Sequence, residues 1–180
     1  MDYQALEEHI KDSVMEEQAK LGFRKEVIRL YYPVGMLNNL FGTACDAEEM
    51  QQALAGFTDF AKERLGEVTI THKKDRFCLL LPEETSIYVH EHKKENEFIH
   101  QLVNLIASHE TDMEQVKKLF EQQPFPSVVE QTTGGEFDTV IHFTQGDDRY
   151  YYCFKDEGFH ITYHRFLPAD YKDLGVFCIT

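Results

Sequence analysis

The stretch from Val128 to Phe166 constrains the fold most, because runs of Val, Ile, Tyr, Phe and Thr alternate in it with turn residues. Gly134 and Gly135 separate two such runs, and glycine accepts the positive φ that a two-residue hairpin turn requires. Further turns are indicated at 145–148 and 155–158, where Gly and Asp are concentrated. The pattern predicts a four-stranded antiparallel meander. Its strands are expected at about 127–132, 137–143, 149–154 and 159–165.

These turns set a register for the meander, and the register sorts the side chains onto two faces. The predicted cross-strand pairs are Val129 with Val140, His142 with Tyr150, Tyr150 with Tyr163, and Tyr152 with Ile161. The predicted core face carries Val129, Val140, His142, Tyr150, Tyr152, Phe154, Phe159, Ile161 and Tyr163. The opposite face is mixed in polarity, so we expect a helix, a second subunit or a ligand to cover part of it. It carries Val128, Ile141, Phe143, Arg149, Tyr151, Cys153, His160, Thr162 and His164.

The rest of the chain shows helical spacing and capping residues between further strand-like runs. Helices are expected at about 2–20, 33–40, 46–65, 95–108 and 111–122, the last two of these five with Phe98 and Thr111 near their starts. A second meander is expected at 68–72, 77–81 and 87–90, with Cys78 to Leu81 as its central strand. For Val27 to Tyr32 a strand is favoured over a helix, because Pro33 disfavours the α conformation of the residue before it.

These elements place the chain in the α+β class, with antiparallel meanders of about six to eight strands in total and helices packed on one side. The length favours a single domain over residues 1–180. The two meanders, 67–92 and 127–166, share a polar turn that ends in Asp-Arg-aromatic, at Asp75 and Asp148. A weak internal duplication is one reading of this likeness, and limited turn chemistry is the other.

The charge of the chain restricts its partners. Lys and Arg number 18 and Asp and Glu number 32, which gives a net charge of −14. Phosphate backbones and anionic membrane surfaces would be repelled, so we expect neither nucleic acid nor membrane as a partner. A protein partner or a homo-oligomer remains compatible with this charge.

The four cysteines and the first residues indicate a cytoplasmic protein. Cys45, Cys78, Cys153 and Cys178 are far apart and form no Cys-x-x-Cys pattern, so reduced thiols are expected rather than a zinc ribbon. The N-terminal residues lack the basic and apolar regions of a signal peptide. No window is apolar for the roughly 18 residues that a membrane span needs.

Two groups of side chains are candidates for binding. His160 and His164 are expected on the mixed sheet face with Tyr151 and Arg149, where they would bind a ligand or simply form a polar strand face. No metal site and no cofactor are indicated, since no metal-ligand motif occurs. The basic residues Lys20, Arg24, Lys25 and Arg29 form the second group, which would bind an anion or pair with Glu16, Glu17 and Glu26.

The stretch Lys20 to Pro33, reading KLGFRKEVIRLYYP and followed by Leu37-Asn38, resembles the opening of a family of uncharacterised bacterial proteins of about this length. The resemblance implies a bacterial cytosolic protein. It brings no activity and no site residues.

A function is therefore not deducible from the sequence, and two hypotheses stay open. The favoured one is a small acidic cytosolic protein that acts as a non-enzymatic interaction or regulatory module. The alternative is a small enzyme or metal-binding protein that uses the histidine-bearing sheet face.

Overall fold

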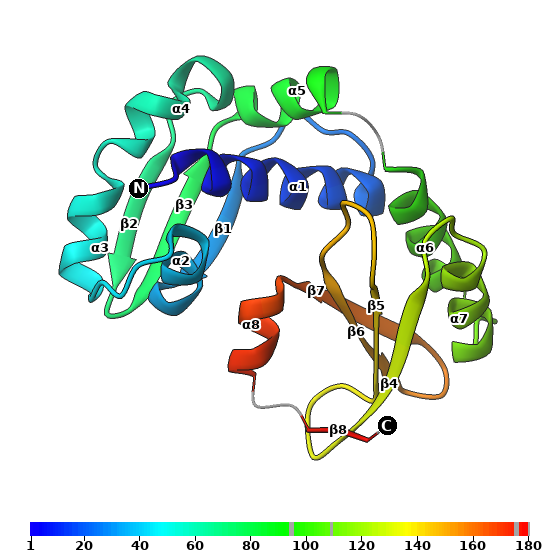
Figure 1. Cartoon of the computed structure of the whole chain (residues 1–180). Coiled ribbons are helices and arrows are strands. Elements are labelled where there is room, and N and C mark those ends of the chain that lie inside the picture. Colours follow the sequence, from blue (N-terminus) through cyan, green and yellow to red (C-terminus); the bar gives the residue numbers. More distant parts are fainter. Residues whose placement is uncertain (94–95, 109, 175–176, 180) are drawn as a thin grey trace. The chain divides into compact units, whose positions relative to one another are not determined.

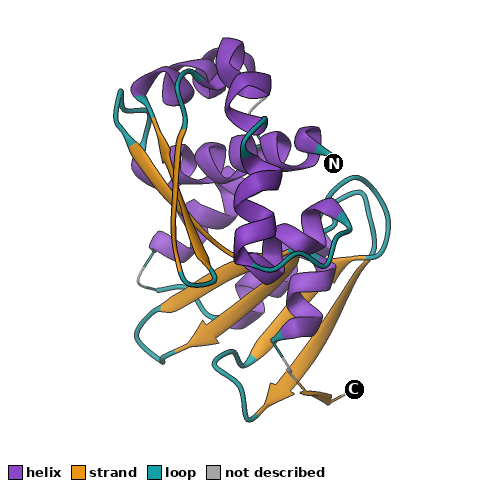
Figure 2. Cartoon of the chain, turned by 90° about the vertical axis from the view of Figure 1, so that its left-hand side faces the viewer, coloured by secondary structure: helices purple, strands orange, loops and turns teal. Residues whose placement is uncertain are grey.

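The computed structural model describes residues 1–93, 96–108, 110–174 and 177–179. The chain divides into two compact units, Met1–Asn96 and Glu97–Thr180. Both combine helices with antiparallel strands, so the α+β class is confirmed (Figures 1 and 2). The expectation of one domain stays a prediction. Among the described residues, no helix has both the length and the apolar character needed to cross a membrane.

The described residues of the first unit form five helices and a three-stranded sheet. Its elements are α1 (Tyr3–Leu21), β1 (Ile28–Pro33), α2 (Val34–Phe41), α3 (Ala47–Leu54), α4 (Phe57–Leu65), β2 (Thr69–Lys73), β3 (Arg76–Leu81) and α5 (Glu83–His92). The strand order is β1-β3-β2, with β3 in the centre, as its apolar sequence predicts. The strand at Val27 to Tyr32 is confirmed as β1.

The core of this unit lies between the helices and one face of the sheet. Leu6, Ile10 and Val14 follow each other at helical spacing on α1 and are fully buried. Tyr32 of β1 and Phe77 of β3 are directly paired and also buried. Because side chains alternate along a strand, the neighbouring residues point away from this core.

Two expectations for this unit are wrong. The helix expected over 46–65 is divided at Ala55 and Gly56, where Tyr3 approaches so closely that a Cβ on Gly56 would lie 2.8 Å from its hydroxyl. That hydroxyl donates a hydrogen bond to the Ala53 carbonyl at 2.6 Å. The strand expected at Ile87 to His90 belongs to helix α5.

Helix α5 forms because Pro82 precedes it and its first turn is acidic, which suits a helix N-terminus. Its buried residues are Thr85, Ser86 and Val89, which share one helical face. Thr85 Oγ1 donates to the Leu65 carbonyl at 2.6 Å. The meander expected over 67–92 therefore has two strands, β2 and β3, followed by a helix.

The second unit contains the C-terminal meander. Its elements are α6 (Glu97–Ala107), α7 (Met113–Glu121), β4 (Ser127–Thr133), β5 (Thr139–Phe143), β6 (Tyr151–Asp156), β7 (Ile161–Phe166), α8 (Pro168–Asp173) and β8 (Phe177–Ile179). The strand order is β7-β6-β5-β4-β8, so the four predicted strands are present and neighbouring (Figure 2). Helix α7 begins with a capping box of Asp112 and Gln115, one residue after Thr111, near which the sequence placed its start.

The predicted register of this meander is wrong at each turn. The connection between β4 and β5 is longer than a two-residue turn, and only Gly134 of the two glycines has positive φ. The observed pairs are Val129 with Ile141, His142 with Tyr151, and Tyr152 with Arg165. At the second turn, the Asp148 carboxylate accepts a hydrogen bond from the Tyr150 amide at 3.1 Å, and β6 starts two residues later than expected.

The slips by one residue at the first two turns exchange the faces of β5, whereas the slip by four residues at the third turn leaves the faces of β7 unchanged. Ile141 and Phe143, expected on the mixed face, share a face with Tyr152 and Phe154. Phe98 of α6 and Phe120 of α7 pack on this face, at ring distances of 5.4 and 5.3 Å from Phe143.

Val140 and His142, expected in that core, lie on the opposite face. Val140 and Cys153 form a small second core there with Phe137 and Tyr171. Tyr171 belongs to α8, so a helix covers part of this face, which is one of the covers expected. Phe159, also expected in the core, is 71% exposed.

Candidate functional site

The outer face of the three-stranded sheet is the most distinctive surface of the first unit. Alternation places on it the side chains that point away from the core formed by Tyr32, Phe77, Leu79 and Leu81. We call this surface the basic face. Its members are Arg29 and Tyr31 of β1, Arg76 and Cys78 of β3, and Thr71 and Lys73 of β2.

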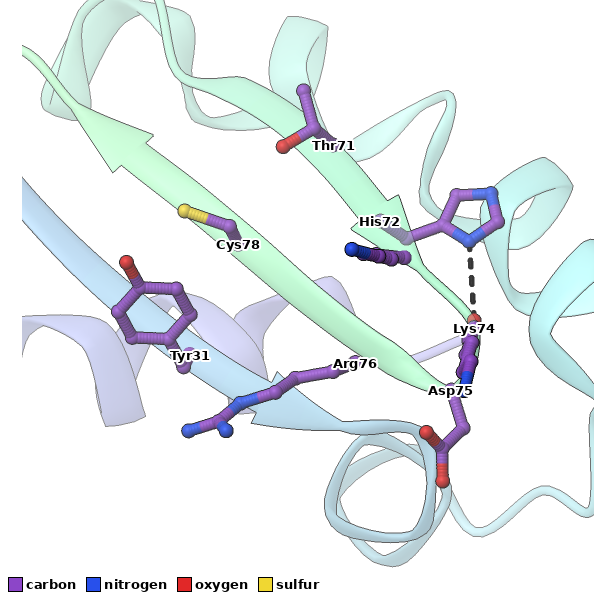
Figure 3. A pocket seen from close by; sticks show the side chains of 8 residues that line it. Tyr31, Thr71, His72, Lys74, Asp75, Arg76 and Cys78 are labelled. Atoms are coloured by element: carbon purple, nitrogen blue, oxygen red, sulfur yellow. Dashed lines mark hydrogen bonds between the residues drawn. The ribbon is translucent and has the colours of Figure 1, made fainter.

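Cross-strand register arranges the basic face in rows. Tyr31 and Thr71 both pair with Cys78, so these three side chains cross the sheet in one line. Lys73 pairs with Arg76 in the next row. Figure 3 shows Tyr31, Cys78 and Thr71 on the three strands, with the Arg76 side chain extending toward β1.

The charge of this surface opposes the charge of the chain as a whole. Arg29, Lys73 and Arg76 are exposed, and within the residues that the structure describes none of them makes an ion pair. The Arg76 guanidinium lies 5.1 Å from the centre of the Tyr31 ring, so it makes a cation–π contact there. The carboxylate of Asp75 lies in the β2–β3 turn. Three cations on one sheet face create a local positive potential in a chain of net charge −14.

A hollow of about 580 Å³ opens on this face. It is lined by Tyr31, Thr71, His72, Lys73, Lys74, Asp75, Arg76 and Cys78. The His72 ring turns to the other side of the sheet, where it stacks on Phe77 at 5.0 Å and its Nε2 lies 3.1 Å from Gln51 Oε1. The rest of the lining offers three cationic side chains against the one carboxylate of Asp75, together with the Thr71 hydroxyl and the side chain of Tyr31, a residue that is 54% exposed. Such a surface suits carboxylate or phosphate groups.

The predicted anion-binding residues have different settings. Lys20 lies at the end of α1 and pairs with Glu16 at 3.4 Å, which is the alternative stated for it. Arg24 and Lys25 are exposed in the segment between α1 and β1. Arg29 is part of the basic face. The cations that share this face with it are Lys73 and Arg76, which are distant in the sequence.

The candidates in the second unit are only partly brought together. Arg149 and Tyr151 line a hollow of about 400 Å³ beside the β5–β6 connection, with His142. Tyr151 is already in contact with other rings, since it stacks on Tyr171 at 4.5 Å and lies 4.3 Å from His142. The Tyr151 side chain is therefore part of the packing around the small second core.

The two histidines proposed there do not share a strand face. His160 lies outside β7, at the turn between β6 and β7, and its Nε2 is 3.3 Å from Glu157 Oε2. His164 lies within β7 and pairs with Cys153. Among the described residues, no three His, Cys, Asp or Glu side chains are grouped so that they could hold a metal ion. The enzyme or metal alternative stays a prediction.

Sequence reasoning missed Tyr31, Lys73 and Arg76 as site residues. A usable signal was present, because Arg29 and Tyr31 are two apart, as are Arg76 and Cys78, and such pairs share a strand face. Combining the pairs required the register between β1 and β3, which the sequence left open.

One family model matches the chain, over residues 3–175. Its description is a domain of unknown function, DUF3877, from an E. rectale gene description. No curated protein and no solved structure matches the chain.

Proposed function

The chain belongs to DUF3877, a family of bacterial origin and unknown function, and we propose that it is a non-enzymatic interaction module that binds an acidic protein segment on its basic face. The observation that supports this proposal is that the exposed side chains of Arg29, Lys73 and Arg76 share one sheet face with the Tyr31 ring, over which the Arg76 guanidinium lies at 5.1 Å. Basic side chains next to an aromatic ring supply charge recognition together with apolar contact area.

The size of the basic face favours a short acidic segment over a nucleic acid. Three strands at about 4.8 Å spacing make a surface roughly 10 Å wide. Charges separated by more than about 8 Å are largely screened at physiological salt, so a short segment responds mainly to the local cations. A nucleic acid or an anionic membrane extends beyond this surface and meets the net charge of −14. We therefore propose no binding to either.

We also place the protein in the bacterial cytoplasm. The cysteines Cys45, Cys78 and Cys153 carry no disulfide, and Cys78 lies half-exposed on the basic face. Reduced thiols are usual in the cytoplasm.

The experiment compares charge reversals on the basic face with a matched control. Arg29→Glu and Arg76→Glu place a carboxylate on the face, whereas Lys62→Glu makes the same charge change on an exposed side chain of helix α4. The probe is a fluorescently labelled peptide of alternating Glu and Thr, with an alternating Gln and Thr peptide as the neutral reference. We expect each reversal on the face to weaken binding about tenfold or more, equivalent to about 1.4 kcal/mol.

Fluorescence polarisation at low and at physiological salt measures the affinity, and circular dichroism confirms that each variant is folded. Equal losses in all three variants would mean that only the net charge matters, and the proposal would be wrong. Tighter binding of single-stranded DNA than of the acidic peptide would also contradict it.

A further inference from the structure

We propose that the acidic segment docks as an additional antiparallel strand along the outer edge of β1. This inference rests on the proposed function and specifies the form in which the partner is bound. Three observations support it: the position of β1 in the sheet, the direction of its backbone groups, and the identity of the residues at that edge.

Strand β1 lies at the edge of its sheet. The order β1-β3-β2 leaves the outer side of β1 without a paired strand in the part of the chain that the structure describes. Edge strands present backbone donors and acceptors that an extended peptide can use, and peptide-binding domains commonly recognise their ligands in this way.

One hydrogen bond fixes which residues of β1 turn their backbone outward. The Val34 amide donates to the Asp75 carbonyl at 2.7 Å, directly beyond the pair of Pro33 with Arg76. In an antiparallel ladder, hydrogen-bonded and non-hydrogen-bonded pairs alternate. Leu30 and Tyr32 therefore bond toward β3, and the N–H and C=O groups of Arg29 and Tyr31 point to the open edge.

Pro33 fits the same alternation. Its missing N–H is on the outward side of the strand, so the proline removes no bond from the ladder with β3. It also ends the row of outward donors. The edge that remains for a partner is therefore centred on Arg29 and Tyr31.

The residues with outward backbone groups are the same residues whose side chains lie on the basic face. In an antiparallel pair, directly opposite residues share a face. Partner residues that bond to the backbone of Arg29 and Tyr31 therefore place their side chains beside those two residues and toward Arg76. The partner residues in between point to the other face, beside Ile28 and Leu30. We infer a ligand with acidic residues at every second position and β-branched or apolar residues between them.

The charges favour an acidic segment over a second copy of this chain as the strand that pairs with β1. Two β1 strands paired about their centres would place Arg29 opposite Tyr31 or Pro33 of the other copy and supply no carboxylate to the basic face, whereas an acidic segment neutralises Arg29 and Arg76. Pairing with the acidic segment is the arrangement that the charges favour.

The test uses N-methylated peptides, because a methyl group on one amide removes one backbone donor and leaves the charge unchanged. In the alternating Glu and Thr peptide, the glutamate amides are expected to face β1 and the threonine amides to face solvent. Methylation of the glutamate amides should weaken binding about tenfold or more, and methylation of the threonine amides should change it by less than about threefold. A permuted peptide with all glutamates in one block should also bind about tenfold more weakly.

The outcomes separate this inference from the proposed function. Equal affinity of both methylated peptides, together with sensitivity to Arg76→Glu, would refute strand docking and leave the binding of acidic segments intact. Binding that ignores both methylation and charge reversal would refute both proposals. Light scattering that shows a dimer of the protein alone, converted to monomer by Tyr31→Pro but not by Tyr31→Ala, would assign the edge to a second copy and overturn the inference.

Discussion

The ion pair between Glu7 and Arg64 makes a quantitative test of the first unit. Glu7 lies on α1 with only 4% of its side chain exposed, and Arg64 of α4 donates two hydrogen bonds to its carboxylate at 2.6 and 2.8 Å. Lys11 lies 2.7 Å from the same carboxylate. A buried carboxylate without partners is costly, so α1 and α4 depend on these contacts.

The size of the effect follows from what remains when Arg64 is replaced by Met. Loss of one partner of a buried ion pair costs about 3–5 kcal/mol. Two features reduce this cost: Lys11 keeps its contact with Glu7, and the Arg64 side chain is 33% exposed, so part of the pair is already hydrated. Methionine also retains apolar contact with the Phe60 ring, over which the guanidinium lies at 5.0 Å. We expect Arg64→Met to reduce the free energy of unfolding by about 2–3 kcal/mol.

The pH dependence has a defined sign. Burial raises the pKa of Glu7, but hydrogen bonds from Arg64 and Lys11 and their positive charges outweigh burial, so its pKa lies below the usual 4.5. A carboxyl with a lowered folded pKa contributes stability above its unfolded pKa and loses it as the pH falls through the folded value. The difference in unfolding free energy between wild type and Glu7→Gln should therefore be constant near neutral pH and shrink below about 4.5.

Urea unfolding followed by far-UV circular dichroism measures these free energies, at neutral pH and at about pH 3. Lys62→Met is the matched control, because Lys62 lies on the same helix with 59% of its side chain exposed and pairs with Glu67 at the surface. It should cost less than about 0.5 kcal/mol. An effect of Arg64→Met no larger than the control, or a Glu7→Gln difference that grows in acid, would refute the reasoning.

Two further predictions concern the C-terminal sheet. Ile141→Ala should lower the free energy of unfolding by about 2–4 kcal/mol because Ile141 is fully buried, whereas Val129→Ala should lower it by less than about 1 kcal/mol because Val129 is exposed. Denaturant unfolding measures both values, and the reverse order would support the register expected from the sequence. Gly134→Val should cost about 1–2 kcal/mol because φ at this residue is +72°, and Gly135→Val should cost less because its φ is not in the left-handed region; equal melting temperatures of the two variants would count against this connection.

Local signals in the sequence predicted most helices and strands. Asp2 caps α1 by accepting from the Ala5 amide, and Asp46 and Glu49 form a capping box at the start of α3, at the two positions where helices were expected to begin. These elements succeed because cap and periodicity are decided within a few residues. The strand expected at Ile87 was wrong. The prediction gave more weight to the β-branched and aromatic residues of this segment than to the proline and the acidic first turn, which begin helix α5.

Register was beyond the sequence because it depends on how side chains bond within the turns. The Thr132 amide bonds to the Asp138 carbonyl at 3.0 Å, and the Thr132 hydroxyl bonds to the Phe137 carbonyl, so the connection is larger than its two glycines suggest. A slip of one residue exchanges the faces of a strand. That exchange moved His142 from the predicted core to the face covered by α8.

The residues of the candidate site could not be grouped from the sequence for the same reason, since their grouping depends on how the strands pair. Sequence reasoning grouped Arg29 with Lys20, Arg24 and Lys25 because they are neighbours along the chain, and Lys20 instead pairs with Glu16. The sheet groups Arg29 with cations that β2 and β3 supply from a distant hairpin. Alternation within a strand predicts which of its residues share a face. Only the pairing between strands shows which residues of different strands are neighbours and which strand lies at the edge of the sheet. The strand docking proposed for the acidic segment thus depends on β1 being an edge strand, since a further strand beside it would occupy the Arg29 and Tyr31 backbone that the segment is proposed to use.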